Sequence, residues 1–182
     1  MTASSTNSGD NNVTANDNTE VFRVLINAPI DRVWAELTRT EVVLPFFFNS
    51  KCDSKGLAVG GPLRMRSKNG KYTSVVGEVL EFNPPHRYRH TFKFTNLDDP
   101  PCEVAYDLRE VDGQTELTLT NINVPAGTKT AQYMNQGGTF ITENLKSIIE
   151  NGKPTLSGRF ILFMIALSAP FTPARCRSQN WP

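Results

Sequence analysis

The side chains that could do acid–base chemistry in this sequence are few, and they centre on two histidines. His86 and His90 are the only histidines in the chain, and His90 alternates with Tyr88 and Phe92. Strand alternation places all four on one face. His90 could act there as a general base, since imidazole titrates near neutral pH. We favour a histidine packed in the wall of the core with one hydrogen bond, because the sequence offers no fixed partner.

Two other residues could exchange protons. Glu78 shares a predicted strand face with Val76 and would enter a cavity there, where burial would raise its pKa. An exposed glutamate near a strand end is an equally good interpretation. Tyr106 lies on the inward face of a later predicted strand and is the third candidate. The candidate catalytic residues are therefore His90, Glu78 and Tyr106, and none is assigned a catalytic role.

Neither a metal nor a cofactor is expected. His86 and His90 are four strand residues apart, about 13 Å, which is too far to share one ion. The three cysteines lack the paired spacing of a disulfide framework or a zinc ribbon, and Cys52 and Cys102 are interpreted as small core residues. The sequence also contains no Walker loop, dinucleotide fingerprint or nucleophile elbow. This scarcity of reactive groups favours binding over catalysis.

These residues must be positioned by a chain of 182 residues, 38% of them hydrophobic, a length that suits one domain. With 19 basic and 18 acidic side chains the net charge is +1, which provides no general field to attract nucleic acid or an anionic membrane. Basic residues on the predicted outer sheet face, such as Arg87 and Arg89, are balanced by acids on a neighbouring strand. We therefore expect a salt-bridged surface and no nucleic-acid partner.

Residues 1–19 are almost all small or polar, which predicts a disordered tail. This tail has neither the apolar run of a secretory signal nor the basic residues of a transit peptide. The expected location is cytoplasmic.

The middle of the chain alternates with the period of strands between two helical stretches. Pro29 opens a helix whose apolar residues recur at helical spacing, and Thr40 would begin a second short helix through Leu44. A long helix is expected from Thr128 to Asn151, ended by Gly152 and interrupted by the costly pair Gly137-Gly138. The strands between them, joined by short turns, predict an antiparallel sheet: 63–66, 73–82, 86–95, 102–109 and 115–122.

Four segments carry a family resemblance: Asn27–Trp34, Val59–Arg64, Val76–Pro85 and Asn144–Gly152. In order and spacing they resemble the SRPBCC (START-like, Bet v-like) superfamily. The most similar branch is named for the C-terminal domain of the heat-shock protein 90 ATPase activator and is often called polyketide-cyclase-like. The resemblance covers residues 20–152. It implies an α+β helix-grip fold, in which a curved antiparallel sheet wraps around a long C-terminal helix and encloses a cavity.

The resemblance also implies a ligand in that cavity. We expect a small hydrophobic or amphipathic molecule, bound without catalysis; the alternatives are a cyclase- or hydrolase-like enzyme acting on a polyketide-like substrate and a co-chaperone-like docking module. Thr139 and Phe46–Phe48 stand where this branch often has tryptophan, so a known ligand cannot be transferred. The expected lining is Phe46, Phe47, Met65, Val76, Tyr88, His90, Phe92, Tyr106, Met134, Gly138 and Ile141.

Residues 153–182 form an apolar extension in which Phe160 to Leu167 are eight apolar residues in a row. A helix of twelve residues spans only about 18 Å, too short to cross a bilayer. We expect a helix that packs on its own domain or on a partner, the favoured version being burial against the domain. A homodimer contact, a chaperone contact and a membrane contact through residues 160–171 are the alternatives, the last not favoured.

Overall fold

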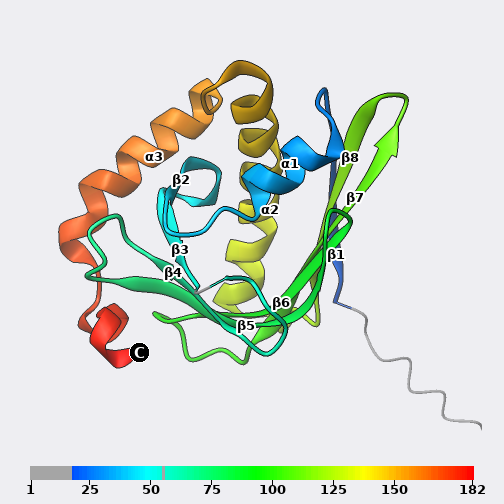
Figure 1. Cartoon of the computed structure of the whole chain (residues 1–182). Helices are drawn as coiled ribbons and strands as arrows, with labels where there is room; N and C mark the ends of the chain where they lie inside the picture. Colours follow the sequence, from blue (N-terminus) through cyan, green and yellow to red (C-terminus); the bar gives the residue numbers. More distant parts are fainter. Residues whose placement is uncertain (1–17, 55) are drawn as a thin grey trace, which may run out of the picture.

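The computed structural model describes residues 18–54 and 56–182, so most of the predicted disordered tail lies outside the described residues. Eight antiparallel strands form one sheet in the order β1-β8-β7-β6-β5-β4-β3-β2. The sheet curls around the long helix α2 (Lys129–Asn151), and α1 (Ile30–Leu37) packs beside α2 (Figure 1). The predicted helix-grip fold is therefore confirmed. The strands are β1 (Glu20–Ile26), β2 (Val43–Leu44), β3 (Ser50–Asp53), β4 (Pro62–Arg66), β5 (Thr73–Asn83), β6 (Arg87–Phe94), β7 (Cys102–Val111) and β8 (Gln114–Ile122).

The sheet has one buried face and one solvated face, as the alternation predicts. In β8 every second residue from Thr115 to Asn121 is buried, and β6 alternates in the same way. Asp112 and Gly113, both at positive φ, form the tight turn between β7 and β8. A β-bulge between Val79 and Glu81 in β5 shifts the register. A bulge of this kind bends the sheet toward its concave side.

The region between α1 and β3 differs from the prediction. The second short helix expected from Thr40 is absent; residues 43–44 form β2, and a 3-10 turn, η1 (Pro45–Phe47), follows. Pro45 explains the difference, because proline disfavours helical backbone at the residue before it, and Leu44 is extended. Phe48 then adopts the left-handed conformation (φ 54°) and ends the turn.

Helix α2 agrees with the sequence prediction at both ends. The Thr128 side chain accepts a hydrogen bond from the Ala131 amide and caps the first turn, and Gly152 ends the helix at φ 71°. Gly138 is required for packing, because a Cβ atom there would lie 2.2 Å from the ring of Phe22 in β1. The costly glycine therefore marks the point where the helix crosses the sheet at closest approach.

Helix α3 (Leu156–Ser168) is where the structure departs most from expectation. Only Gly158 and Leu162 of this helix are buried, so the expected burial against the domain is wrong for most of its apolar side chains. The reason is that α3 is apolar on nearly every side, and such a pattern cannot tell which face meets the protein. No single helix in residues 18–54 and 56–182 is long and apolar enough to cross a membrane; α2 and α3 pass that test only as a pair bent by 115°.

The chain after α3 returns to the sheet. Three single 3-10 turns follow, η2 (Ala169–Phe171), η3 (Ala174–Cys176) and η4 (Ser178–Asn180). The Ser178 amide donates to the carbonyl oxygen of Lys71 at 3.0 Å, and Tyr72 forms an isolated bridge with Arg177. The terminal segment is thus fixed beside the turn between β4 and β5, and α3 spans the distance between that contact and the end of α2 (Figure 1).

Candidate functional site

Three polar aromatic residues meet on the concave face of the sheet. Tyr88 and His90 project from β6, and Tyr106 projects from β7 directly opposite Tyr88 in the strand register. The Tyr88 ring lies 5.8 Å from Tyr106 and 5.1 Å from His90, and His90 lies 6.2 Å from Tyr106, measured between ring centroids. All three are at most 4% exposed. We call these residues the Tyr–His cluster.

His90 is held neutral inside this cluster. Its Nδ1 lies 2.8 Å from the carbonyl oxygen of Thr91. A carbonyl can only accept, so Nδ1 carries the proton and donates. Burial lowers the pKa of His90 to about 4, and the Thr91 hydrogen bond opposes that shift only in part. At neutral pH the ring is therefore uncharged, and Nε2 is left as an acceptor.

The two tyrosines keep their protons. Burial is the main cause that raises the pKa of Tyr88 and of Tyr106 well above the ordinary phenol value. The hydroxyl of Tyr88 is buried and has no hydrogen-bond partner among the residues that the structure describes. A buried polar group without a partner costs about 1–3 kcal/mol, so this hydroxyl is a destabilising feature of the unliganded protein.

Cys52 of β3 borders the cluster, since its charge when ionised would act on both tyrosines. Burial raises the pKa of its thiol to about 12, with Glu41 and Asp53 adding to the shift. Burial likewise raises the pKa of Cys102 to about 11. Both thiols are free and buried, which confirms that they are small core residues. Neither is a thiolate nucleophile at neutral pH.

Most of the expected lining residues do reach the interior, but Val76 does not, and two other positions expected to face inward, Glu78 and His86, also need correction. Val76 faces outward opposite Arg64 and Lys93, and Val75 takes the inward place opposite Met65 and Phe94. The prediction put the wrong valine inside because it had no information on which residue of the Val75-Val76 pair begins the alternation. Phe47 is half-buried, and the buried members are Phe46, Met65, Tyr88, His90, Phe92, Tyr106, Met134, Gly138 and Ile141.

Glu78 and His86 are the other two corrections. Glu78 is exposed and its neighbour Val79 is the buried residue opposite His90, so Glu78 cannot serve the cluster. His86 is exposed in the turn before β6 and does not share the buried face of His90. The prediction extends the alternation of β6 one residue too far, to His86, because the Asn83–His86 turn comes before the strand begins at Arg87.

Aromatic neighbours that the sequence did not single out complete the interior. Trp34 of α1 lies 5.3 Å from Phe82, whose ring meets Tyr88 edge-on at 5.9 Å. Phe48 stacks on Phe140 of α2 with ring centroids 4.2 Å apart. Trp34 was visible in the stripe of α1, but nothing in the sequence pairs Phe48 with Phe140. Of these rings, Phe82 contacts the Tyr–His cluster directly and gives Tyr88 an apolar neighbour.

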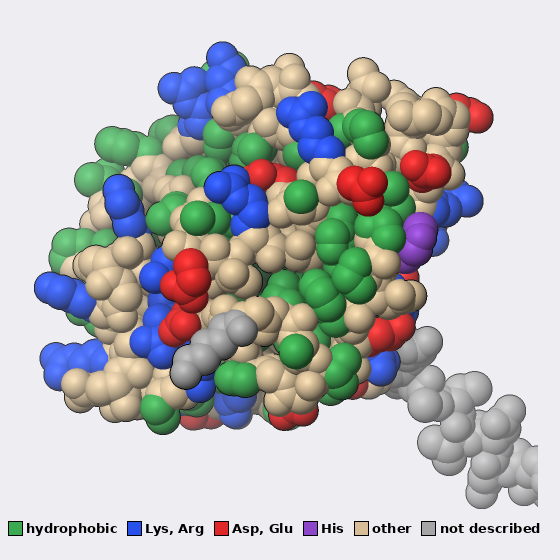
Figure 2. Space-filling model, viewed as in Figure 1, with side chains coloured by type: hydrophobic (Ala, Val, Ile, Leu, Met, Phe, Trp, Pro, Cys, Tyr) green, Lys and Arg blue, Asp and Glu red, His purple; other side chains and the backbone are tan. Residues whose placement is uncertain are grey.

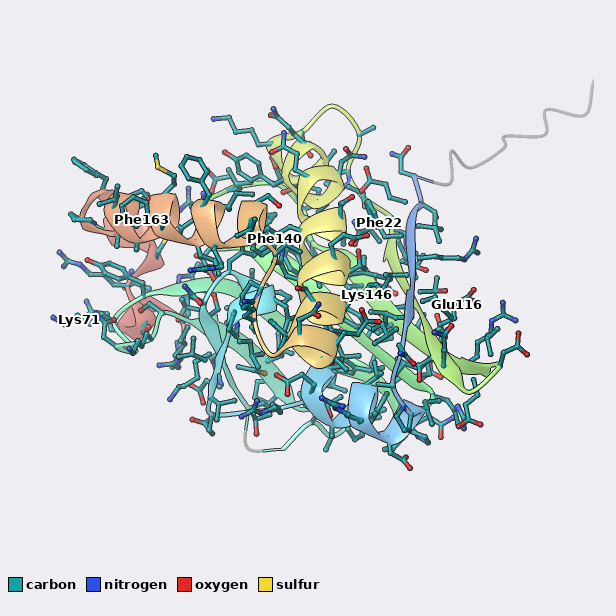
Figure 3. All side chains as sticks on the ribbon, turned by 90° about the horizontal axis from the view of Figure 1, so that it is seen from above. Phe22, Lys71, Glu116, Phe140, Lys146 and Phe163 are labelled. Atoms are coloured by element: carbon teal, nitrogen blue, oxygen red, sulfur yellow. The ribbon has the colours of Figure 1, made fainter. Side chains whose placement is uncertain are left out.

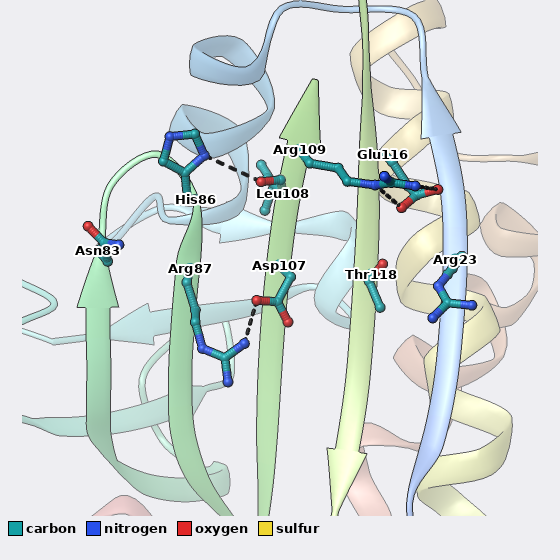
Figure 4. A pocket seen from close by; sticks show the side chains of 9 residues that line it. All are labelled: Arg23, Asn83, His86, Arg87, Asp107, Leu108, Arg109, Glu116 and Thr118. Atoms are coloured by element: carbon teal, nitrogen blue, oxygen red, sulfur yellow. Dashed lines mark hydrogen bonds and ion pairs between the residues drawn. The ribbon is translucent and has the colours of Figure 1, made fainter. Parts of the chain in front are cut away.

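An open hollow of about 610 Å3 lies elsewhere, on the outer face of the sheet between β1 and the end of β5. Figure 4 shows ion pairs among its side chains, Arg109 with Glu116 and Arg87 with Asp107. The expected salt-bridged outer face is thus confirmed. In residues 18–54 and 56–182, no three His, Cys, Asp or Glu side chains come together as a metal site.

A family model for "Activator of Hsp90 ATPase homolog 1-like protein" matches residues 27–150. The chain belongs to this family. No curated protein matches the chain. The matched residues run from the end of β1 almost to the end of α2, so they include the whole Tyr–His cluster. α3 and the terminal segment lie outside the match.

Solved structures share the fold. The chain is 24% identical to DynU16, from the dynemicin biosynthetic locus, with a TM-score of 0.63; 76% of this chain but only 49% of DynU16 is covered. It is 20% identical to the Aha1 dimer of Colwellia psychrerythraea (TM-score 0.61, 74% and 98% covered). The Plasmodium falciparum HSP90 activator PFC0360w is likewise 20% identical (TM-score 0.58, 75% and 97% covered). At such identities these likenesses establish the fold alone.

Proposed function

We propose that the protein binds a small hydrophobic or amphipathic molecule between the concave face of the sheet and α2. The observation that carries this proposal is the Tyr88 hydroxyl, a buried donor without a partner. A ligand with one polar acceptor would satisfy it, and the surrounding rings of Phe82 and Phe92 would cover the apolar remainder. Ligand sites commonly combine such apolar walls with a few convergent polar groups.

The protonation states support holding a ligand more than transforming it. His90 has a pKa of about 4 and is therefore a weak base at neutral pH. General bases work best when their pKa lies near the operating pH. Tyr88 and Tyr106 hold their protons firmly, so each hydroxyl can donate a hydrogen bond at neutral pH. The cluster therefore offers two hydroxyl donors and one imidazole acceptor, a set that orients a polar headgroup.

The binding proposal is tested with the variant Tyr88→Phe and the fluorescent fatty acid cis-parinaric acid as the probe. Removing the unpartnered hydroxyl should raise the unfolding free energy of the unliganded protein by about 1 kcal/mol. The same change should weaken probe binding about tenfold, because the probe loses its donor. Urea unfolding measures the first effect and fluorescence titration the second.

The matched control is Tyr133→Phe, since Tyr133 lies in α2 but is 41% exposed. This variant should change neither the stability nor the affinity for cis-parinaric acid. If Tyr88→Phe lowers stability and leaves the affinity for cis-parinaric acid unchanged, the hydroxyl does not bind the ligand and the proposed site is rejected.

A co-chaperone role is the second candidate, and the match to the Hsp90-activator family favours it. It predicts that the purified protein stimulates the ATPase activity of Hsp90. Turnover that stays at the basal rate at saturating protein would exclude this role. A cyclase- or hydrolase-like activity is less well supported, because it would require a stronger base than His90.

A further inference from the structure

Helix α3 presents a continuous apolar stripe to the outside. Its outward residues recur at helical spacing, and they are strongly exposed: Leu156 (82%), Phe160 (66%), Phe163 (59%) and Leu167 (56%). Met164 widens the stripe on one side and Phe171 (85% exposed) extends it beyond the helix. In Figure 2 hydrophobic side chains gather along the edge of the molecule that α3 forms in Figure 1. An exposed apolar surface of this kind marks a docking site.

The stripe is held outward by fixed contacts at both ends of α3. At the start, the amide of Thr155 donates to Oδ1 of buried Asn144 at 3.0 Å, and Gly158 packs directly on the same side chain. At the other end, Ser178 and Arg175 tie the terminal segment to Lys71 and Asp98. Turning the stripe inward would break one of these two attachments. α3 is therefore a fixed arm that projects sideways from α2 (Figure 3).

The charged side chains of the segment that carries this stripe are all basic. Residues 153–182 contain four basic side chains, namely Lys153, Arg159, Arg175 and Arg177, and no aspartate or glutamate. The turn that receives the terminal segment adds Lys68 and Lys71. In Figure 3, Lys71 lies on the side of the molecule toward which α3 projects. Asp98 lies outside this extension and forms an ion pair with Arg175.

We propose that α3 docks on an anionic membrane surface, with its apolar stripe among the acyl chains and the neighbouring basic side chains on the lipid phosphates. A helix that is apolar over its whole outward half can insert that half among acyl chains, which pack against all the side chains exposed there. Basic groups beside such a stripe add electrostatic attraction to anionic lipids.

A second copy of this chain fits the stripe less well. Two α3 helices packed against each other would place the basic side chains of both copies at one interface, and residues 153–182 contain no aspartate or glutamate to compensate them. Packing of two helices would also cover only one side of each stripe. Both the charge and the width of the apolar surface therefore favour the lipid surface.

The test is flotation of the full chain with lipid vesicles. Vesicles of phosphatidylcholine alone are compared with vesicles that also contain phosphatidylserine. We expect binding to the anionic vesicles, weaker binding to the neutral ones, and a loss of the difference at high salt. The double variant Phe160→Ser/Phe163→Ser should bind at least about tenfold more weakly. Arg159→Glu should weaken binding to the anionic vesicles and leave binding to the neutral ones unchanged.

Val59→Ser is the matched control, because Val59 is 67% exposed in a loop away from α3. It should bind vesicles as the unaltered chain does, and thermal unfolding should show all variants folded, since the altered side chains are exposed. The proposal is overturned if neither vesicle floats the protein, or if the double variant floats equally well. It is also overturned if sedimentation shows a dimer that the double variant abolishes while vesicles bind nothing, since α3 would then join two copies.

Discussion

Helices α2 and α3 are consecutive, and although α3 is the more apolar of the two, it is the one whose apolar side chains stay exposed. In α2 the apolar side chains form one stripe, and Met134, Ile141 and Leu145 on that stripe are buried on the sheet. In α3 apolar side chains occur on almost every side, and only Gly158 and Leu162 are buried. The contrast shows that the arrangement of apolar residues, more than their number, decides whether a helix joins the core.

The strongest test of this contrast is the same substitution in both helices. Leu145→Ala removes a fully buried side chain and should lower the unfolding free energy by about 2–5 kcal/mol. Leu167→Ala removes a side chain that is 56% exposed and should change it by less than about 0.5 kcal/mol. Urea unfolding of the two variants gives both numbers. Similar losses would mean that α3 is buried in solution, contrary to the structure.

A second difference concerns pH, because the interior contains a buried histidine and α3 has no carboxyl or imidazole group. Below pH 6.5 the unfolded chain protonates His90, whereas the folded protein does so only near its pKa of about 4. Stability should therefore fall as the pH drops through this window, by roughly 3 kcal/mol in total. Above pH 6.5 this group contributes no pH dependence.

The variant His90→Phe keeps an aromatic ring but cannot titrate. Its stability should fall less than that of the unaltered protein between pH 6.5 and 4, as measured by urea unfolding at several pH values. Leu167→Ala should keep the full pH dependence, since α3 does not contribute to it. If His90→Phe loses as much stability in acid as the unaltered protein does, groups other than His90 cause the loss.

A smaller loss of stability than that of Leu145→Ala is expected at the junction of the two helices. Asn144 of α2 accepts from the amide and the hydroxyl of Thr155, and donates to the carbonyl oxygen of Phe140. Asn144→Ala leaves the Thr155 amide without this partner and should cost about 1–3 kcal/mol. The variant should also accelerate amide hydrogen exchange more in α3 than in α2. Asn135→Ala, at an exposed position of α2, is the control and should leave exchange in α3 unaltered.

The parts of the fold that were predictable have strong local signals. Periodicity and capping placed α2 between Thr128 and Gly152, and alternation together with the family resemblance gave the antiparallel sheet. The failures have non-local causes. The register of β5 depends on which valine meets Met65 across the sheet, and the position of α3 depends on where Asn144 and the terminal segment hold its ends.

The candidate site was predictable in composition but not in chemistry. Alternation placed Tyr88, His90 and Tyr106 on the inner face, and the structure brings the three rings together. The missing partner of the Tyr88 hydroxyl is a property of the whole interior and leaves no local trace in the sequence. Glu78 is not a site residue because a shift of one residue in the alternation of β5 exchanges its inner and outer faces, and Val79 is the inward residue.

The attachment of the terminal segment beside the β4–β5 turn has a kinetic consequence. The segment is held by the hydrogen bonds of Ser178 to Lys71 and Thr73, by the Arg175–Asp98 ion pair, and by hydrogen bonds from Arg64 and Arg66 to its last two carbonyl groups. α3 adds to these contacts by tethering the segment and keeping its effective concentration near the turn high. A single proteolytic cut within α3 would make the contact intermolecular, and the terminal peptide would then diffuse away. The integrity of α3 is thus what retains the last residues of the chain on the domain.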